Sequence, residues 1–295
     1  MIKFSKFLMG IVFLVGLVPT LFGQIAMQLA SLQRTYMLYE PVNMVLRFRN
    51  DSGRPLVFGL DEQIRAEVYF EIQDSQYRRM DKYPLKPLVI NKGRVVLPGQ
   101  TIDLQVNLNK LYHFDTPGVY RVHAFIKHPQ IKDTFKSNDI RFDISKGTVF
   151  WEREIGIPES FLKINNEKVS SEKSRFYRIK SLSDNPNKYF YCVLEDSQKV
   201  YQIIRIGQAY GIEMPQMAVD MAGMLHIIVP HGVKLYKYYQ IDLDGEFAQE
   251  VKYYKSTKFA PQLVTDSNGK VTVGGGEIAV PNVDYIVETP TYYVQ

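Results

Sequence analysis

Histidines are the side chains of this chain best suited to acid–base or metal chemistry. Their spacing matches neither the H-E-x-x-H helix motif nor a zinc ribbon, so the sequence predicts no metal site and no cofactor. His231 stands between a proline and a glycine, which is typical of an exposed turn. His123 and His226 stand in alternating runs and are predicted to be hydrogen-bonded positions within a sheet. The five histidines are His113, His123, His128, His226 and His231.

Nucleophiles and paired carboxylates are the next candidates for catalysis. Cys192 lies in the apolar run 189–194 with no second cysteine in the chain, which predicts a buried, unreactive thiol. The G-x-S-x-G motif of a serine nucleophile is absent. Asp220 and Asp266 stand in D-x-x-G turns and are predicted to brace them. Together with Glu277 they are also the candidates for a glycoside hydrolase site, which would need two carboxylates within about 10 Å in one pocket.

Aromatic residues offer chemistry for binding rather than for catalysis. Tyrosines alternate with lysines between residues 234 and 255, and such a surface suits a glycan or a protein, because the ring stacks while the hydroxyl and ammonium groups form hydrogen bonds. The alternative is an ordinary sheet whose exposed edges are guarded by lysines. Trp151 is either a stacking platform or a packing residue between domains. The candidate binding residues are Trp151, His231, Tyr236, Tyr238, Tyr239, Tyr253 and Tyr254.

The composition places these residues in a folded β-rich protein. Of 295 residues, 45% are hydrophobic and 23% charged, and 20 tyrosines and 17 phenylalanines accompany one tryptophan and one cysteine. This excludes a long disordered chain, a collagen and a disulfide scaffold. At roughly 150 residues per domain, the length predicts about two domains.

The first 23 residues are predicted to be a secretory signal peptide. Lys3 and Lys6 precede the uncharged run 7–18, and Pro19 to Gly23 then interrupts it. The alternative is an uncleaved anchor, but the 16 apolar residues of 7–22 fall short of the ~20 needed to cross a bilayer. We expect cleavage after Gly23 and a mature protein without a membrane span, located in the periplasm, at the cell surface or outside the cell.

The charge balance argues against a nucleic-acid partner. The net charge is +5, and removal of the signal peptide takes two lysines with it, leaving 34 basic against 31 acidic residues. A balance of +3 without a clustered basic face is too small for binding to a phosphate backbone.

Residues 24–146 show the two-residue period of β-strands with one polar face. Turn-forming Gly, Pro and Asn separate the strands, and no helical period intervenes, which predicts an antiparallel sandwich of about seven strands. The clearest alternating runs are 42–48, 66–72, 102–108, 120–126 and 140–144.

One motif within this region carries a family resemblance. The sequence D-T-P-G-V-Y-R-V at 115–122 resembles the turn and strand of immunoglobulin-like domains, in which the tyrosine hydrogen-bonds back to the corner backbone. Val122 stands where an antibody domain has a cysteine, so the likeness is to disulfide-free bacterial immunoglobulin or fibronectin-type modules. The resemblance implies a binding, spacing or inhibitory role. Inhibition of a protease through the loop 83–93 is therefore a further alternative.

The second half contains an internal repeat. Residues 147–175 are polar and predicted to connect two domains, and the following domain, 176–295, repeats P-Q-x-x-x-D-x-x-G at 215–223 and 261–269. Each copy predicts a strand, a tight turn and a second strand. The unit resembles the blades of bacterial sialidase-type propellers. With a degenerate copy near 183–206 there are three units, which fits an open propeller, a ring closed by oligomerisation, or a compact stack of sheets.

The sequence thus predicts an all-β protein with an immunoglobulin-like sandwich and a blade-repeat domain. The leading hypothesis is an exported, non-enzymatic binding or assembly module that recognises a protein or a glycan at the cell envelope. A carbohydrate-active hydrolase and a protease inhibitor are the alternatives.

Overall fold

The computed structural model describes residues 25–81, 88–89, 93–131, 133–158, 174–249 and 251–286. Its regular structure is β-strand apart from one short 3-10 turn at Leu108–Lys110. The predicted all-β class is therefore confirmed. The predicted signal peptide 1–23 and most of the loop 83–93 lie outside the described residues. Within the described ranges, no helix has the length and apolarity that a membrane span requires.

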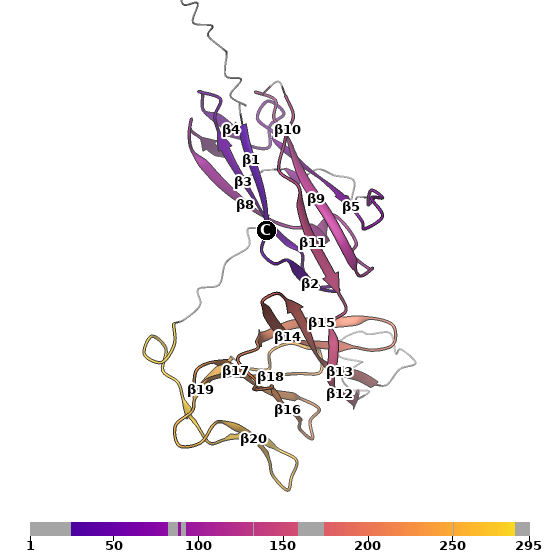
Figure 1. The fold of residues 1–295 in the computed structure, drawn as a ribbon, viewed down its shortest axis with the longest axis vertical. Coiled ribbons are helices and arrows are strands. Elements are labelled where there is room, and N and C mark those ends of the chain that lie inside the picture. The colour runs from indigo at the N-terminus through magenta and orange to yellow at the C-terminus, as the bar shows by residue number, and fades with distance from the viewer. Residues whose placement is uncertain are drawn as a thin grey trace, which may run out of the picture.

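The first domain consists of two sheets and a small ribbon (Figure 1). One sheet is β1 (Ile25–Ser31), β3 (Asn43–Asn50) and β8 (Thr101–Asn107). The other is β2 (Thr35–Met37), β11 (Ile140–Ser145), β9 (Gly118–Lys127), β5 (Glu67–Gln73) and β6 (Leu88–Val89), with β10 (Phe135–Lys136) beside β9. The ribbon pairs β4 (Leu56–Phe58) with β7 (Arg94–Val96). Only β2 and β11 run parallel; the other described pairs are antiparallel.

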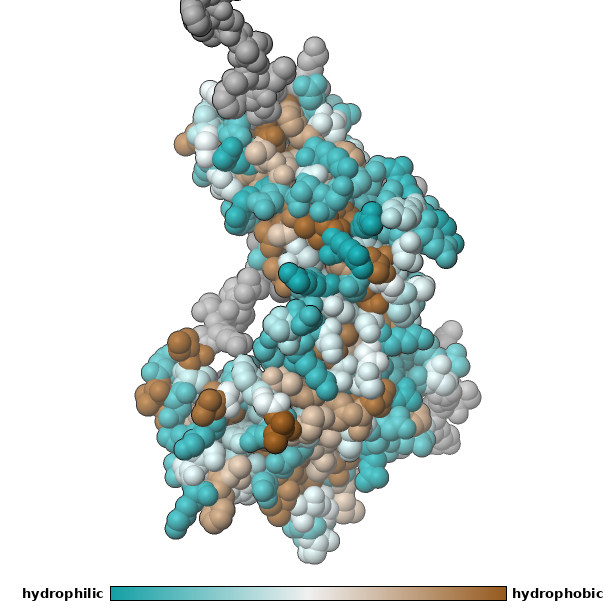
Figure 2. All heavy atoms as spheres, in the orientation of Figure 1, coloured by the Kyte–Doolittle hydropathy of each residue, from teal (hydrophilic) through white to brown (hydrophobic). Residues whose placement is uncertain are grey.

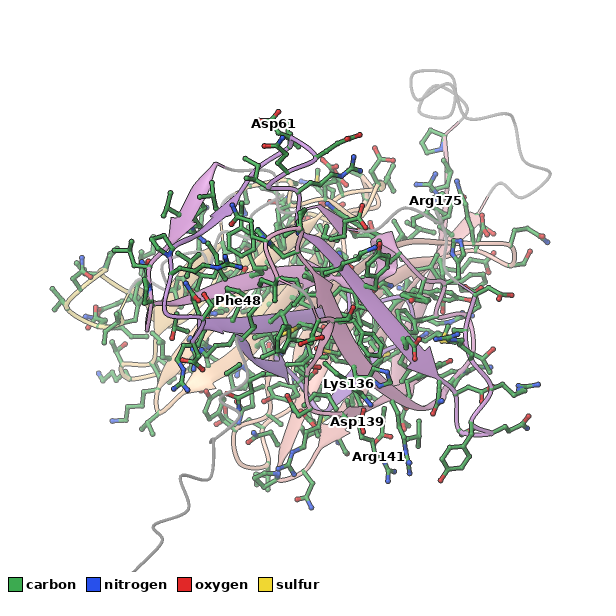
Figure 3. The ribbon with its side chains drawn as sticks, turned by 90° about the horizontal axis from the view of Figure 1, so that it is seen from above. Phe48, Asp61, Lys136, Asp139, Arg141 and Arg175 are labelled. Atoms are coloured by element: carbon green, nitrogen blue, oxygen red, sulfur yellow. The ribbon has the colours of Figure 1, made fainter. Side chains whose placement is uncertain are left out.

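Alternation along the strands produces the core between these sheets. On β3, Met44, Leu46 and Phe48 are buried, while the residues between them face outward. Phe48, which is labelled in Figure 3, meets Phe58 edge to face with ring centroids 5.4 Å apart. Burial of each such side chain stabilises the fold by about 2–3 kcal/mol. Tyr120 donates a hydrogen bond to the Thr116 carbonyl at 2.5 Å, the bond that its position after the turn predicts.

The second domain packs two larger sheets and a hairpin. The first sheet is β12 (Thr148–Gly156), β13 (Ser174–Asp184), β14 (Asn187–Glu195) and β15 (Val200–Gln208). The second is β16 (Gln216–Val219), β17 (Leu225–Gly232), β18 (Leu235–Ile241), β19 (Lys252–Lys255) and β22 (Glu277–Ile278). The hairpin of β20 (Gln262–Thr265) and β21 (Val271–Gly274) contacts β16 and β17.

Residues 147–175 are predicted to be a connection between domains, but the first part of this range is a strand. Residues Thr148–Gly156 form β12, which pairs along its length with β13. Most of its side chains are exposed because it is an edge strand with one neighbour, and this polarity is what made the sequence look like a loop. Residues 159–173 lie outside the described part of the chain.

The core of the second domain lies between its two sheets. Tyr177, Phe190 and Leu194 from the first sheet pack against Ile227 and Ile241 from the second. Cys192 belongs to the same cluster with 2% of its surface exposed, and burial raises the pKa of its thiol to about 12. Because the nucleophilic thiolate is not populated at neutral pH, this cysteine is unreactive, as predicted.

The predicted turns of the repeat are confirmed. In both copies the aspartate Oδ1 accepts hydrogen bonds from backbone N–H groups of its own turn. Asp220 accepts one from Met224, and Asp266 accepts one each from Asn268 and Lys270. The closing glycines, Gly223 and Gly269, have φ of +81° and +71°, a region that favours glycine. The two hairpins nevertheless differ in context: β16–β17 opens a five-stranded sheet, whereas β20–β21 stands as a separate pair.

The two domains are joined directly and contact one another (Figure 1). β11 ends at Ser145 and β12 begins at Thr148, so only two residues connect them. Met37 of the first domain is buried against Leu182, Tyr191 and Val193, which lie on the outer face of the first sheet of the second domain. The Thr35 hydroxyl also donates to Asp184 Oδ1 at 3.2 Å.

Candidate functional site

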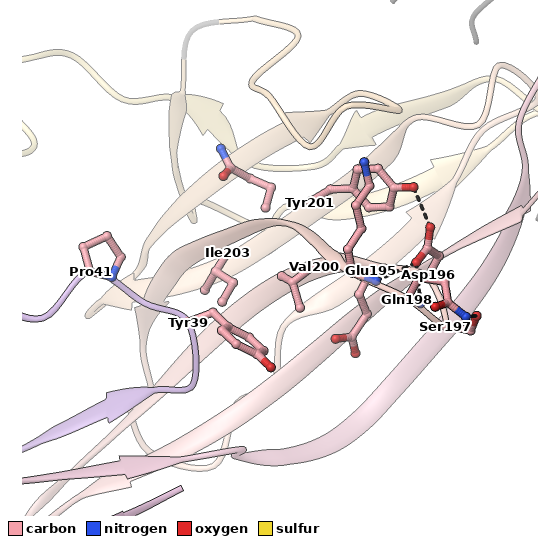
Figure 4. Close-up of a pocket in the computed structure, with 11 residues that line it drawn as sticks. Tyr39, Pro41, Glu195, Asp196, Ser197, Gln198, Val200, Tyr201 and Ile203 are labelled. Carbon is pink, nitrogen blue, oxygen red and sulfur yellow. Dashed lines mark hydrogen bonds between the residues drawn. The ribbon is translucent and has the colours of Figure 1, made fainter. Parts of the chain in front are cut away.

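A pocket of about 620 Å³ lies where the two domains meet (Figure 4). Residues 195–203, the end of β14, the hairpin turn and the beginning of β15, form one side. Tyr39 and Pro41 of the first domain form the other. Ligand sites commonly form at domain boundaries, where concave surface arises without opening a core.

Tyr39 occupies a strained position on the wall of this pocket. It is the third residue of the turn Met37–Glu40, which the Glu40 N–H closes on the Met37 carbonyl at 2.9 Å. Its φ of +71° lies in the left-handed region, where a tyrosine costs about 1–3 kcal/mol and a glycine is preferred. Its side chain is nevertheless 48% exposed, so core packing does not account for the residue at this position.

Glu40 anchors this turn between the two domains. Its Oε2 accepts the Met37 N–H at 2.8 Å, and its Oε1 accepts from Gln33 Nε2 at 3.0 Å and from the Tyr191 hydroxyl at 3.3 Å. Pro41, which follows, restricts Glu40 to an extended backbone and so keeps its side chain directed inward. Burial raises the pKa of the Glu40 carboxyl, against the opposing effect of these hydrogen bonds. The turn that carries Tyr39 is therefore fixed by contacts from both domains.

The acidic groups of the pocket are held ionised. Burial alone would raise the pKa of Glu195, but hydrogen bonds and charge from Arg178 at 2.5 Å and Lys180 at 3.1 Å outweigh it, and the pKa lies below its usual value. The pKa of Asp196 is likewise lowered: the Tyr201 hydroxyl and the turn N–H groups outweigh its desolvation. Neither carboxyl retains a proton at neutral pH. Both are therefore hydrogen-bond acceptors in this state.

The tyrosine ring beside these carboxylates is positioned by cations. The Lys199 Nζ lies 4.1 Å from the centroid of the Tyr201 ring, and the Arg175 guanidinium carbon lies 3.7 Å from it. Arg175 is buried and donates to the Leu243 carbonyl at 2.5 Å (Figure 3). The Tyr201 hydroxyl donates to Asp196 Oδ2 at 2.5 Å. Contacts with two cations and one carboxylate therefore hold the Tyr201 ring at the pocket.

The residues predicted as binding candidates lie elsewhere in the second domain. His231 and Tyr253 are brought together, with ring centroids 5.7 Å apart. Tyr236, Tyr238 and Tyr254 instead pack around Ile228 in a small cluster near β20 and β21. Tyr239 and Trp151 belong to the core between the two sheets, where the Tyr239 hydroxyl donates to the Ile206 carbonyl at 2.8 Å. None of these seven lines the pocket between the domains.

Two of the three carboxylates predicted for a hydrolase, Asp220 and Asp266, are engaged in structural contacts. Asp220 accepts from its turn and lies 3.1 Å from His226 Nε2, while the Nδ1 of the same ring lies 2.7 Å from the Tyr238 hydroxyl. The three residues of this relay are buried or half-buried. Asp266 caps an exposed turn, and Glu277 is exposed on β22. The described residues contain no cluster of three metal-ligating side chains.

Sequence reasoning missed the pocket residues Tyr39, Glu195 and Asp196. A positive φ at a tyrosine leaves no mark in the sequence, since the pattern Y-E-P predicts only a turn into a strand. The available signal was the turn D-S-Q-K at 196–199 beside an ion-pair-rich strand, which predicts a polar loop but not its partner from the other domain.

Comparisons with known proteins give little guidance. No protein-family model matches the sequence, and no curated protein matches it. Among solved structures, the chain is similar to the alkylpurine DNA glycosylase AlkC of Pseudomonas fluorescens bound to DNA containing an abasic site analog (12% identity, TM-score 0.27, covering 41% of this chain and 30% of that one). It is similar at the same level to a family 123 glycoside hydrolase from Clostridium perfringens (10% identity, TM-score 0.27, 41% and 27% covered).

A third similar structure is the sporulation control protein Spo0M from Bacillus subtilis (7% identity, TM-score 0.28, 63% and 90% covered). The chain spans less than a third of the length of the first two proteins. Structural similarity with TM-scores below 0.3 gives no information about the function of this protein.

Proposed function

We propose that this protein is a non-enzymatic binding module that holds a neutral, hydroxyl-rich ligand, a segment of a glycan, in the pocket between its two domains. The observation that carries the proposal is the backbone of Tyr39. A half-exposed ring held at φ +71° costs stability and fills no core, and such strain clusters at ligand-binding positions.

The chemistry of the pocket favours a hydroxyl-rich sugar over an apolar molecule. Two ionised carboxylates, Glu195 and Asp196, accept hydrogen bonds from hydroxyl groups, while Arg178, Lys180 and Lys199 balance their charge. Gln198 and Ser197 add groups that donate as well as accept. The Tyr39 ring offers a flat face on which the C–H groups of a sugar can stack. Binding without hydrolysis is supported by the lowered pKa of both carboxyls, since glycoside hydrolysis requires one protonated carboxyl.

The finer architecture belongs to the same proposal. We propose that the first domain is an immunoglobulin-like module, which the Tyr120 bond to Thr116 supports, and that the second is a non-closed stack of blade-like units, which the two D-x-x-G hairpins support. We also propose export through residues 1–23 and a role at the cell envelope. A glycan-binding protein with a signal peptide would meet its ligand there.

The test compares tyrosine-to-glycine substitutions at two exposed residues that both have a positive φ. Tyr39→Gly removes the ring and relieves the positive φ. Tyr77→Gly does the same at φ +61° on an exposed turn of the first domain that does not line the pocket. Both variants are expected to be at least as stable as the wild type in urea unfolding. On an array of neutral glycans, and then by calorimetry, Tyr39→Gly is expected to bind at least about ten-fold more weakly, with Tyr77→Gly unchanged.

Three results would overturn the proposal. One is a wild-type chain, begun at Gln24, that binds no glycan on the array. Another is equal binding by Tyr39→Gly and the wild type. The third is release of reducing sugar from a bound glycan that stops in Glu195→Gln or Asp196→Asn, which would favour the hydrolase instead.

A further inference from the structure

Three segments of the second domain converge at one end of its second sheet. They are residues 209–215 after β15, the β17–β18 hairpin tip 231–234, and residues 280–286 after β22. A chain of ring contacts ties them together: Tyr210 to His231 at 6.4 Å, His231 to Tyr253 at 5.7 Å, and Tyr253 stacked on Tyr285 at 3.9 Å. We call these three segments the tip end.

The tip end exposes branched aliphatic side chains to an unusual degree. Ile212 is 97% exposed, Val233 94%, Ile286 87% and Val283 79%. Single exposed aliphatic residues are normal on a protein surface, but here four side chains, each at least 79% exposed, stand on three segments that ring contacts tie together; we call these four side chains the patch. Figure 2 shows hydrophobic side chains standing out on the second domain around β19 and the segment that follows β22.

The surroundings of this patch are basic. Across residues 209–215, 231–237, 251–258 and 277–286 the sequence has five lysines and three carboxylates. Two of the carboxylates are engaged: Asp284 lies 3.1 Å from Lys255 Nζ, and Glu213 accepts from the Tyr236 hydroxyl at 3.2 Å. The third, Glu277, is exposed and stands opposite Lys255 where β22 pairs with β19. Lys234, Lys252 and Lys258 are exposed. The patch therefore combines protruding aliphatic groups with a positive rim.

We propose that the tip end docks the protein on the surface of an anionic lipid bilayer. Ile212, Val233 and Ile286 would enter the interface between headgroups and acyl chains, to a depth of roughly 5–10 Å, while the lysines meet anionic headgroups. The aromatic contacts and the pair of Lys255 with Asp284 hold the three segments in place, so little order is lost on docking.

The alternatives fit this surface less well. A second copy docked about a two-fold axis would bring the same lysines face to face, which repels. A rigid protein partner requires a continuous complementary surface, whereas these aliphatic groups stand on three separate segments. A fluid headgroup layer adapts to separate protrusions. Because the pocket lies at the beginning of β15 and the tip end beyond its last residue, docking leaves the pocket accessible.

The test measures co-sedimentation of the chain begun at Gln24 with vesicles of equal parts phosphatidylglycerol and phosphatidylcholine, and with phosphatidylcholine alone. We expect binding to the mixed vesicles that weakens at least about five-fold between 0.1 and 0.5 M salt. The triple variant Ile212→Ser, Val233→Ser, Ile286→Ser is expected to bind at least about ten-fold more weakly. Leu60→Ser, at an aliphatic side chain of the first domain that is 66% exposed, is the control and should bind normally.

Charge is tested separately. Lys252→Glu with Lys258→Glu should lose binding to the anionic vesicles, and Lys127→Glu, an exposed lysine of β9, should not. The proposal is overturned if the wild type fails to sediment with anionic vesicles. It is overturned too if light scattering shows a dimer that the triple serine variant abolishes, because the occupant is then a second copy. Neither result depends on glycan binding in the pocket.

Discussion

Glu40 is the buried carboxyl group that joins the turn of Tyr39 to both domains. Its side chain is 9% exposed, and burial raises its pKa above the ordinary value of 4.5. A raised folded-state pKa means that the folded protein binds a proton more tightly than the unfolded chain does. The stability that the protonated form contributes is therefore present below about pH 4.5 and is lost as pH rises through the folded-state pKa.

This sign gives a prediction for Glu40→Gln. The amide keeps an oxygen that can accept the Met37 N–H but cannot ionise, so the variant should lack this loss of stability with rising pH. We expect the difference in unfolding free energy between the variant and the wild type to shift in favour of the variant from pH 4 to pH 7, measured by urea titration. A difference that stays constant between pH 4 and pH 7 would contradict the role of burial.

At the scale of elements, three D-x-x-G turns of the second domain stack on one another. A Cβ added at Gly223 would meet Leu243 of the turn Asp242–Gly245 at 3.0 Å, and one added at Gly269 would meet Met221 of the turn Asp220–Gly223. The Met221 N–H also donates to the Gly269 carbonyl at 3.2 Å. The glycines are thus required both for their positive φ and for the close approach of the neighbouring turn.

The first and third of these turns, which carry Asp220 and Asp266, should respond differently to loss of the aspartate. Asp220→Ala removes a turn acceptor and also leaves the buried His226 without its carboxylate partner, so we expect a cost of about 2–3 kcal/mol. Asp266→Ala removes only the bonds within an exposed turn, at about 0.5–1 kcal/mol. Urea unfolding measures both. Equal costs would mean that the contact with His226 contributes nothing.

At the scale of the whole molecule, Gly147 controls how the two domains meet. Its φ is +65°, and a Cβ there would lie 3.0 Å from the Ser181 carbonyl oxygen and 2.7 Å from Met37 Cε. Gly53 has a similar φ of +72°, but a Cβ there would meet nothing within 4 Å. The two glycines therefore separate backbone strain from disruption of the domain contact.

We expect Gly53→Ala to cost about 1 kcal/mol and Gly147→Ala at least about 1 kcal/mol more. Trp151, the single tryptophan, lies in the second domain and reports its unfolding by fluorescence. In the wild type, fluorescence and circular dichroism should give one transition. In Gly147→Ala the two curves should separate, because contact between the domains is weakened. Coincident curves in that variant would show that the joint does not couple the domains.

Part of this structure could be predicted from local pattern. The alternation at Met44, Leu46 and Phe48 predicts which side of β3 is buried, since neighbouring side chains on a strand point to opposite faces. The D-x-x-G pattern predicts the turns at Asp220 and Asp266, because both the capping and the positive φ are local. The edge strand β12 was missed because half of an edge strand's environment is solvent, so its composition resembles that of a loop.

The sequence by itself determined the all-β class, the buried cysteine and the repeated turns, because each depends on residues near one another in the chain. Tertiary structure decided the rest. It divided the tyrosine-rich region, placing Tyr239 in a core and Tyr253 beside His231, because successive strand residues face opposite sides and only packing says what covers each. It also made the pocket, since Tyr39 and Asp196 are far apart in sequence and meet only where one domain rests on the other.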